Sequence, residues 1–326
     1  MTIVPLPVDE VSRLGRAVLD EVRTAVVGMD LAIRTALATI LAGGHVLFED
    51  VPGLGKTLAA RSLATALGLE FGRLQCTPDL LPSDITGSSV YDPASSQFVF
   101  RPGPIFTGLF LADEINRTAP KTQSALLEAM AERQVTVEGS THRLPGPFHV
   151  MATSNPVEYE GTYPLPEAQL DRFMVRLSVG YLERDAEIDV LSRRVSRRAE
   201  EAPVRSVVDS ETVLHMQAGV EAVDIDRDVM GYCVDLAAGT RTHAAVEVGV
   251  SPRGAQSLML VARGLAVLAG RDFVTPEDVK EVAVSALAHR LTLTPQSWAS
   301  GVDPRTVVES LLGQVPGPTV APSRPQ

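Results

Sequence analysis

The residues HVLFEDVPGLGKTLAA (45–60) begin with a short apolar run, pass through a glycine-containing turn and continue with apolar residues at helical spacing. This order predicts a strand, a loop and a helix. The turn almost matches the phosphate-binding pattern G-x-x-x-x-G-K-S/T, because Lys56 and Thr57 fill its last two positions while Asp50 replaces the usual first glycine. In such a loop, backbone N–H groups hold phosphate oxygens and the positive end of the following helix faces them. The stretch therefore predicts a phosphate-binding loop with an unusual first residue.

The later residues of this loop suit the chemistry of phosphate binding. Gly53 and Gly55 allow the backbone to approach phosphates closely. Lys56 supplies a positive charge for the outer phosphates, and Thr57 supplies a hydroxyl for Mg²⁺. Asp50 is predicted to close the strand with its carboxylate turned away from the phosphates. The alternative is an ordinary Gly/Pro turn that carries one of the chain's few lysines by chance. The residues predicted to hold the nucleotide phosphates are Pro52, Gly53, Leu54, Gly55, Lys56, Thr57 and Leu58.

An acidic pair follows a second apolar run in LFLADEINR (109–117), where Asp113 and Glu114 end a predicted buried strand. Side chains at this point emerge at the carboxyl edge of a parallel sheet, beside the phosphate loop. Asp113 would then hold Mg²⁺ through water, and Glu114 would orient and polarise an attacking water molecule. The alternative is an acidic N-cap at the end of a strand. The position of the pair downstream of a phosphate loop favours the catalytic interpretation.

Strand and helix patterns alternate along the first half of the chain. Apolar residues recur at helical spacing in residues 11–25 and 31–41, and further buried strands are predicted at 108–114 and 148–155. This alternation predicts an α/β fold in which helices flank a parallel sheet. Two segments with alternating apolar residues around Gly, Ser and Pro turns interrupt it, and both are predicted to be inserted hairpins. These segments are residues 78–104 and 133–147.

Strand patterns fade near residue 183 and helical patterns replace them. One of these helices is predicted to begin at Thr275–Pro276–Glu277–Asp278, which has the pattern of a capping box with proline at the first helical position. The predicted organisation is an α/β nucleotide-binding domain at 1–182 and a smaller all-helical lid domain at 183–313. The Pro-rich tail at 314–326 has little to bury and is expected to be disordered.

The composition is that of a globular protein outside membranes. The 326 residues are 45% hydrophobic and 21% charged, and no apolar run is long enough to cross a bilayer. A formal net charge of -11 disfavours a general nucleic-acid-binding surface, and the arginines of residues 193–198 are assigned to a solvated helix face. Two cysteines and six histidines at no metal-binding spacing indicate neither a disulfide framework nor a zinc site. A cytoplasmic location is expected.

Three longer strings extend the pattern beyond the phosphate loop: LADEINRTAPKTQSALLEAM (111–130), ATSNPVEYEGTYPLPEAQLDRF (152–173) and SPRGAQSLMLVARGLAVLAGRDFVTPEDVK (251–280). They resemble the MoxR family of AAA+ ATPases, and the resemblance runs from about Val27 to Leu293. The opening EDVPG also occurs in that family, so Asp50 departs from the general loop pattern without departing from these relatives. The resemblance implies an AAA+ P-loop NTPase fold, with two hairpin insertions and a helical lid.

The resemblance also implies roles for residues outside the two motifs. Asn155 in TSNP matches the polar sensor that reads the γ-phosphate, although an Asn-Pro turn is the alternative. Arg172 in LDRF matches the arginine finger that serves the nucleotide of a neighbouring subunit, the alternative being a surface arginine. Arg253 in SPRG matches the second sensor, which reaches from the lid to the bound phosphates, the alternative being a solvated residue at a helix start. Arg117 is a further candidate for a cross-subunit contact. The positions where the family seats adenine are Val27 and Gly28.

The implied function is Mg²⁺-dependent ATP hydrolysis coupled to the remodelling or maturation of partner proteins. The resemblance implies a homo-oligomeric ring, expected to be a hexamer, and a partner that can carry a von Willebrand A domain. Three alternatives stay open: a nucleic-acid motor, a metal-chelatase-like ATPase subunit, and a nucleotide-switched scaffold with negligible hydrolysis. The acidic balance argues against the first. Glu114, Asn155 and Arg172 argue against the last.

Overall fold

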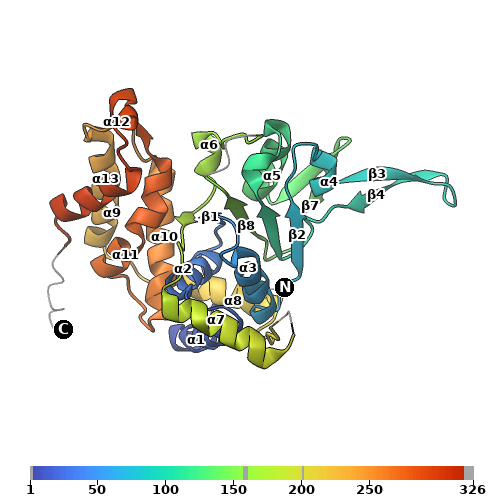
Figure 1. Ribbon diagram of the computed structural model, residues 1–326, viewed down its shortest axis with the longest axis horizontal. Helices are drawn as coiled ribbons and strands as arrows, with labels where there is room; N and C mark the ends of the chain where they lie inside the picture. The colour runs from blue at the N-terminus through green and yellow to red at the C-terminus, as the bar shows by residue number, and fades with distance from the viewer. Residues whose placement is uncertain (1–2, 157–160, 200–201, 319–326) are drawn as a thin grey trace.

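The computed structural model describes residues 3–156, 161–199 and 202–318. At its centre lies a five-stranded sheet in the order β2-β5-β8-β1-β9, with helices on both faces (Figure 1). Each strand runs parallel to its neighbours, so the predicted parallel sheet flanked by helices is confirmed. The strands are β1 (Val46–Glu49), β2 (Phe71–Gln75), β5 (Leu109–Asp113), β8 (His149–Ser154) and β9 (Val175–Leu177).

Alternate residues of a central strand bury their side chains on opposite faces of the sheet. Leu109 and Leu111 of β5 belong to the apolar core that contains helices α1 to α3, whereas Phe110 and Ala112 belong to the core that contains α5. Both faces are therefore covered, which explains why these strands are continuous apolar runs in the sequence. The helices of this part are α1 (Val8–Ala25), α2 (Asp30–Leu41), α3 (Lys56–Ala66), α4 (Pro82–Thr86), the 3-10 helix η1 (Ile115–Arg117), α5 (Pro120–Glu132) and α6 (Glu167–Leu170).

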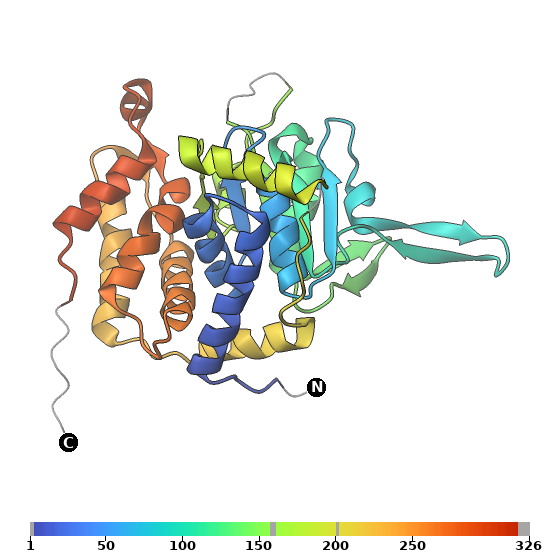
Figure 2. The same ribbon diagram turned by 60° about the horizontal axis from the view of Figure 1, so that its bottom comes forward.

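Both predicted hairpins are present as antiparallel pairs. They consist of β3 (Gly87–Asp92) with β4 (Gln97–Pro102), and β6 (Gln134–Val137) with β7 (Ser140–Arg143). The rings of Phe100 and His142 stack at 3.7 Å between centroids and join the bases of the two hairpins. From there the β3–β4 hairpin projects far from the body of the protein (Figures 1 and 2). Near its tip the exposed rings of Tyr91 and Phe98 contact each other, with 5.5 Å between ring centroids.

Helices dominate the remainder of the chain, and α9 to α13 gather beside the sheet on the side away from the β3–β4 hairpin (Figure 1). Thr275 and Asp278 form the predicted capping box, with proline at the first helical position of α11. The sequence did not predict one short antiparallel pair, β10 with β11. The elements are α7 (Arg184–Arg197), α8 (Ser210–Glu221), α9 (Arg227–Thr242), β10 (Val246–Val248), α10 (Pro252–Leu268), α11 (Pro276–Leu287), the 3-10 helix η2 (Ala288–Arg290), β11 (Thr292–Leu293), α12 (Pro295–Ala299) and α13 (Pro304–Gln314).

One continuous apolar core links this helical part to the sheet, because it contains buried residues of α1 to α3, α8, α10 and α11 together. The predicted boundary at residue 182 therefore stays a prediction. The predicted tail starts at Gln314, the last residue of α13, and its residues 319–326 lie outside the described chain. Among the described residues, no helix combines the length and apolar character needed to cross a bilayer.

Candidate active site

The phosphate loop lies between β1 and α3, with its glycines in backbone conformations that other residues rarely adopt. Gly53 has a φ of 85° and Gly55 a φ of 82°, and Gly55 is the N-cap of α3. A Cβ atom added at either glycine would meet nothing within 4 Å, so open space borders the loop at both positions. Backbone amides beside open space at the start of a helix suit the binding of phosphate.

Asp50 turns its carboxylate away from this space. Asp50 Oδ2 accepts hydrogen bonds from the backbone N–H groups of Val179 (2.6 Å) and Gly180 (2.7 Å), and Oδ1 accepts one from Val51 at 2.9 Å. Ser178 Oγ also donates to Oδ2, at 3.3 Å. The carboxylate that replaces the usual first glycine therefore ties the start of the loop to the chain that follows β9. This geometry removes the objection that its charge would repel phosphate.

Lys56 is the first residue of α3 and is 9% exposed. Its Nζ donates to the carbonyl oxygens of Asp50 at 2.7 Å and of Val51 at 3.1 Å, across the mouth of the loop. Burial lowers the pKa of Lys56, while the charges of Asp50, Asp113 and Glu114 oppose that effect. The lysine thus presents a positive charge inside the loop.

Asp113 ends β5 and is held by three side chains. Thr57 Oγ1 and Arg73 Nη2 donate to Asp113 Oδ2 at 3.2 and 2.7 Å. Thr153 Oγ1, from the neighbouring strand β8, donates to Asp113 Oδ1 at 2.6 Å. The hydroxyl and the carboxylate predicted to serve Mg²⁺ are therefore adjacent. Mg²⁺ commonly takes one or two protein oxygens and completes its shell with water and phosphate, so this pair fits it.

Glu114 stands next to Asp113 in a left-handed backbone conformation, with a φ of 58°. Its N–H donates to Thr153 Oγ1 at 2.7 Å, while Gln75 Nε2 and Arg117 Nη1 donate to Glu114 Oε2 at 2.8 and 3.1 Å. Residues other than glycine are held in such a conformation at a cost, and they are concentrated at functional sites. Arg117, a candidate for a cross-subunit contact, here pairs with Glu114 of its own chain.

Asn155 follows β8 and is 5% exposed. The side chain of Asn116 brackets its backbone, because Asn116 Nδ2 donates to Asn155 O at 3.0 Å and Asn155 N donates to Asn116 Oδ1 at 3.4 Å. Asn116 itself lies in η1, directly after the acidic pair. The loops after β5 and β8 are therefore fastened to each other.

The central strands β5, β8 and β1 bring these groups to one edge of the sheet, around a cavity of about 220 Å³. The predicted residues that line it are Pro52, Gly53, Leu54, Gly55, Lys56, Thr57, Asp113, Glu114 and Asn155. A second cavity, of about 500 Å³, adjoins the same loop and is lined by Val27 and Leu58 together with residues of α7. Gly28 packs beside it, because a Cβ at this glycine would lie 2.4 Å from Leu182 Cδ2.

Arg172 and Arg253 lie elsewhere. Both line a different cavity of about 230 Å³, which also contains Arg133 and Asp171 but no residue of the phosphate loop. Arg172 Nη1 donates to Leu127 O within α5. Arg253 is the second residue of α10, whose N-cap is Ser251, and its side chain is 54% exposed. This position agrees with the alternative interpretation, a solvated residue at a helix start. Within one chain, Arg172 and Arg253 therefore line the same cavity, and Lys56 lines a different one.

Several polar residues of the site were missed in the sequence. Arg73 and Gln75 extend from β2 to the acidic pair, and Thr153 bridges Asp113 and Glu114. Arg193, Arg194 and Arg197 of α7 also line the larger cavity. No residue of α7 is buried and Arg193 pairs with Asp189, in agreement with the solvated face that the charge pattern predicted. The signal available for Arg73 and Gln75 was their alternation in FGRLQ, which places both on one face of a strand.

The fold and this cavity define a phosphate-loop α/β unit with a helical lid, as found in AAA-type ATPases. The model of the family described as "ATPase family associated with various cellular activities (AAA)" matches residues 45–175, and the AAA lid domain matches residues 238–311. The chain is 40% identical over 320 residues to the chaperone MoxR1 of Mycobacterium tuberculosis, covering 95% of this chain and 84% of that protein. The chain belongs to the MoxR family of AAA+ ATPases.

Two further similarities extend over almost the whole chain. The protein YeaC of Bacillus subtilis is 48% identical over 305 residues, with 94% of this chain and 95% of that protein covered. The crystal structure of a candidate ATPase from Cytophaga hutchinsonii matches with a TM-score of 0.88 at 41% identity, covering 95% of this chain and 96% of that chain. The family resemblance inferred from the sequence is thereby confirmed.

Proposed function

We propose that this chain binds ATP with Mg²⁺ and hydrolyses it in the cavity between the phosphate loop and the ends of β5 and β8. The observation that carries the proposal is the convergence of a lysine, a hydroxyl–carboxylate pair, a second carboxylate and an amide on that cavity: Lys56, Thr57 with Asp113, Glu114 and Asn155. Catalysis of phosphoryl transfer depends mainly on positioning and on charge stabilisation, and these groups can supply both.

Each side chain has a distinct proposed task. Lys56 and the loop amides bind the phosphates, and Thr57 with Asp113 holds the metal ion. Bound Mg²⁺ supplies positive charge that stabilises negative charge on the phosphates. Glu114 orients the attacking water through its carboxylate. Gln75 and Arg117 hold Oε2 of that carboxylate in place.

The larger cavity is the proposed site of the adenine base. It adjoins the phosphate loop through Gly53, Leu54 and Gly55, and apolar side chains such as Val27 and Leu58 line it. Gly28 contributes by the absence of a side chain, since it allows Leu182 to pack closely at the rim. An apolar slot beside a phosphate site matches the two chemical halves of a nucleotide.

Arg172 and Arg253 are proposed to act on the nucleotide of a neighbouring subunit in a homo-oligomeric ring, for which a hexamer is the expected size. Support comes from their joint position at a cavity that their own phosphate loop does not reach. An arginine supplied by a neighbour can raise the rate of hydrolysis by about 10³ to 10⁵. Hydrolysis would then depend on assembly.

The energy of hydrolysis is proposed to remodel or mature partner proteins, among them a protein with a von Willebrand A domain. The name of the relative MoxR1 describes a chaperone. The net charge of -11 disfavours a nucleic-acid track. The exposed rings of Tyr91 and Phe98 provide an apolar surface suited to contact with a protein chain.

Three variants test the ATPase proposal. Lys56→Ala should abolish binding of a fluorescent ATP analogue, whereas Glu114→Gln should bind it normally and turn over at less than about 1% of the wild-type rate. Arg172→Ala should bind ATP normally and lose about 10³-fold in turnover of the assembled oligomer. Wild-type protein that fails to bind Mg²⁺ and ATP in any assembly state would contradict the proposal, and an Arg172→Ala oligomer with unchanged turnover would remove the neighbour's arginine from it.

A further inference from the structure

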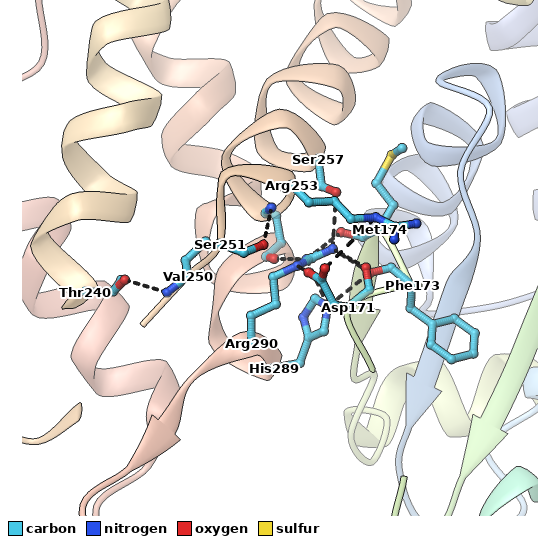
Figure 3. Close-up of polar contacts among 12 residues, drawn as sticks. Asp171, Phe173, Met174, Thr240, Val250, Ser251, Arg253, Ser257, His289 and Arg290 are labelled. Carbon is cyan, nitrogen blue, oxygen red and sulfur yellow. Dashed lines mark hydrogen bonds and ion pairs between the residues drawn. The ribbon is translucent and has the colours of Figure 1, made fainter. Parts of the chain in front are cut away.

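Arg290 is a buried cation at the contact between the lid and the segment that carries Arg172 (Figure 3). It ends η2, and its side chain is 2% exposed. Within the helical part, its guanidinium donates to Ser257 Oγ at 3.1 Å and to the carbonyl oxygen of Ala286. Burial of a guanidinium is costly unless its charge and its N–H groups are paired. The partners on the other side of the contact supply that pairing.

Across the contact, Arg290 binds the residues on both sides of Arg172. It donates to Asp171 Oδ1 at 2.6 Å, to Phe173 O at 2.9 Å and to Met174 O at 3.2 Å. Residues 171–174 lie between α6 and β9, outside helix and strand. The planar fork of one arginine therefore joins the lid to a short segment outside helix and strand, and adds side-chain bonds to the backbone bonds that the segment makes with α6 and with His45.

Asp171 extends the network to Arg253. Its Oδ1 binds Arg290, while its Oδ2 lies 4.0 Å from Arg253 Nε. The carboxylate thus stands between a buried arginine and an exposed one. Arg172 and Arg253 are both linked to this network, the first through its chain neighbours and the second through Asp171.

We propose that Arg290 is a positioning residue, which holds Arg172 and Arg253 in one fixed arrangement for the nucleotide of the neighbouring subunit. This inference rests on the proposed function, in which those two arginines act across a subunit contact. If space filling were its only role, an apolar side chain would serve at this buried position without the cost of desolvating a charge. The fork instead matches the carbonyl and carboxylate oxygens around Arg172.

The first test is Arg290→Gln in the assembled oligomer. Turnover should fall by about 10- to 100-fold, as expected when a catalytic group is misplaced by about 1 Å, while KM for ATP and binding of a fluorescent ATP analogue change less than about twofold. Arg290→Lys should fall similarly, because a lysine keeps the charge but loses the planar fork. Arg263→Gln is the matched control, since Arg263 is a mostly buried arginine of α10 that pairs with Glu221 instead, and it should keep wild-type turnover.

Mixed oligomers separate a role across the subunit contact from a role within one chain. Arg290→Gln retains Glu114, whereas Glu114→Gln retains intact arginines, so a random 1:1 mixture should recover about one quarter of the wild-type turnover. A mixture of Arg290→Gln with Arg172→Ala should stay at the low turnover of the single variants, because neither chain then supplies a correctly placed Arg172. The reference mixture of Arg172→Ala with Glu114→Gln tests the proposed function itself.

The outcomes distinguish the two proposals. If turnover recovers in the reference mixture but not in the mixture of Arg290→Gln with Glu114→Gln, the positioning role is overturned and the proposed function stands. Failure of the reference mixture would overturn the positioning role together with the proposed action of Arg172 across the subunit contact. If Arg290→Gln does not fold, as judged by its thermal melt, Asp171→Asn replaces it in the same mixtures, because the Asp171 side chain is 24% exposed.

Amide hydrogen exchange gives a measurement independent of turnover. Residues 171–174 should exchange at least about tenfold faster in Arg290→Gln, while residues 53–57 of the phosphate loop keep their wild-type rates. Equal acceleration of both segments would mean general destabilisation and would overturn the proposal.

Discussion

Replacement of Asp50 by glycine would restore the usual first residue of the phosphate loop. We nevertheless expect it to lower both the free energy of unfolding and the affinity for ATP. Asp50 is a buried residue, 8% exposed, and its carboxylate accepts hydrogen bonds from the backbone N–H groups of Val51, Val179 and Gly180. Two of these bonds cross from the loop to the chain after β9. Glycine provides no acceptor for any of them.

The expected loss follows from the number and kind of these bonds. A hydrogen bond to a charged group contributes about 1.5–3 kcal/mol, and a buried N–H left without an acceptor costs about 1–3 kcal/mol. Loss of the two crossing bonds should therefore lower the free energy of unfolding by about 2–4 kcal/mol. Asp50→Asn retains one acceptor oxygen and should lose about half as much. The corresponding decrease in Tm is about 4–8 °C for Asp50→Gly.

Thermal melts and ATP titrations measure both consequences. Because Asp50 anchors the loop to the segment that leads into the larger cavity, Asp50→Gly should also bind ATP at least about tenfold more weakly, a change of about 1.4 kcal/mol. Asp235→Asn is a control for Asp50→Asn, since Asp235 is an exposed carboxylate of α9. An Asp50→Gly protein with wild-type Tm and wild-type ATP affinity would refute the reasoning.

The stabilisation of the protein by the Asp50 carboxylate should also depend on pH. Burial alone would raise the pKa of Asp50, but hydrogen bonds from the N–H groups of Gly180, Val179 and Val51 outweigh it and lower the pKa below its usual value. An acid with a lowered folded-state pKa stabilises the protein above its unfolded pKa of about 3.9, and loses this contribution as the pH falls through the folded pKa. The difference in Tm between wild type and Asp50→Asn should therefore be full at neutral pH and shrink below about pH 4.

Two other substitutions should change stability in opposite directions without entering the nucleotide cavity. Gly231→Ala should raise the free energy of unfolding by about 0.5–1 kcal/mol in thermal melts, because Gly231 lies inside α9 and a Cβ there meets nothing within 4 Å; a lower Tm would contradict this. Asp278→Ala should cost about 3–5 kcal/mol, since it removes the acceptor of the Thr275 N–H in the capping box and leaves the guanidinium of Arg271 without its carboxylate partner; a loss below about 1 kcal/mol would show that the pair contributes little.

The sheet and its polar edge could be predicted because their signals are local. Buried parallel strands give apolar runs, and the residues after β1, β5 and β8 meet because the carboxyl ends of neighbouring parallel strands lie at one edge. β2 escaped prediction because it is an edge strand with partly exposed residues, so FGRLQ contains no continuous apolar run. Its Arg73 and Gln75 were missed for the same reason.

The positions of Arg172 and Arg253 could not be predicted from local pattern. Their placement depends on contacts between segments far apart in the chain, such as the ion pair of Arg290 with Asp171, 119 residues away. No periodicity encodes such a contact. The sequence strings suggested roles for these arginines, whereas only the folded chain shows that they share a cavity distinct from that of Lys56.

The β3–β4 hairpin has a consequence for how members of such a family can diverge. Its base is anchored by the stacking of Phe100 on His142, but near its tip Tyr91 and Phe98 contact each other in solvent. Substitutions at that tip therefore carry little folding penalty and leave the residues of the phosphate loop untouched. The outermost residues of the hairpin can therefore vary among relatives while the α/β body beneath them stays the same.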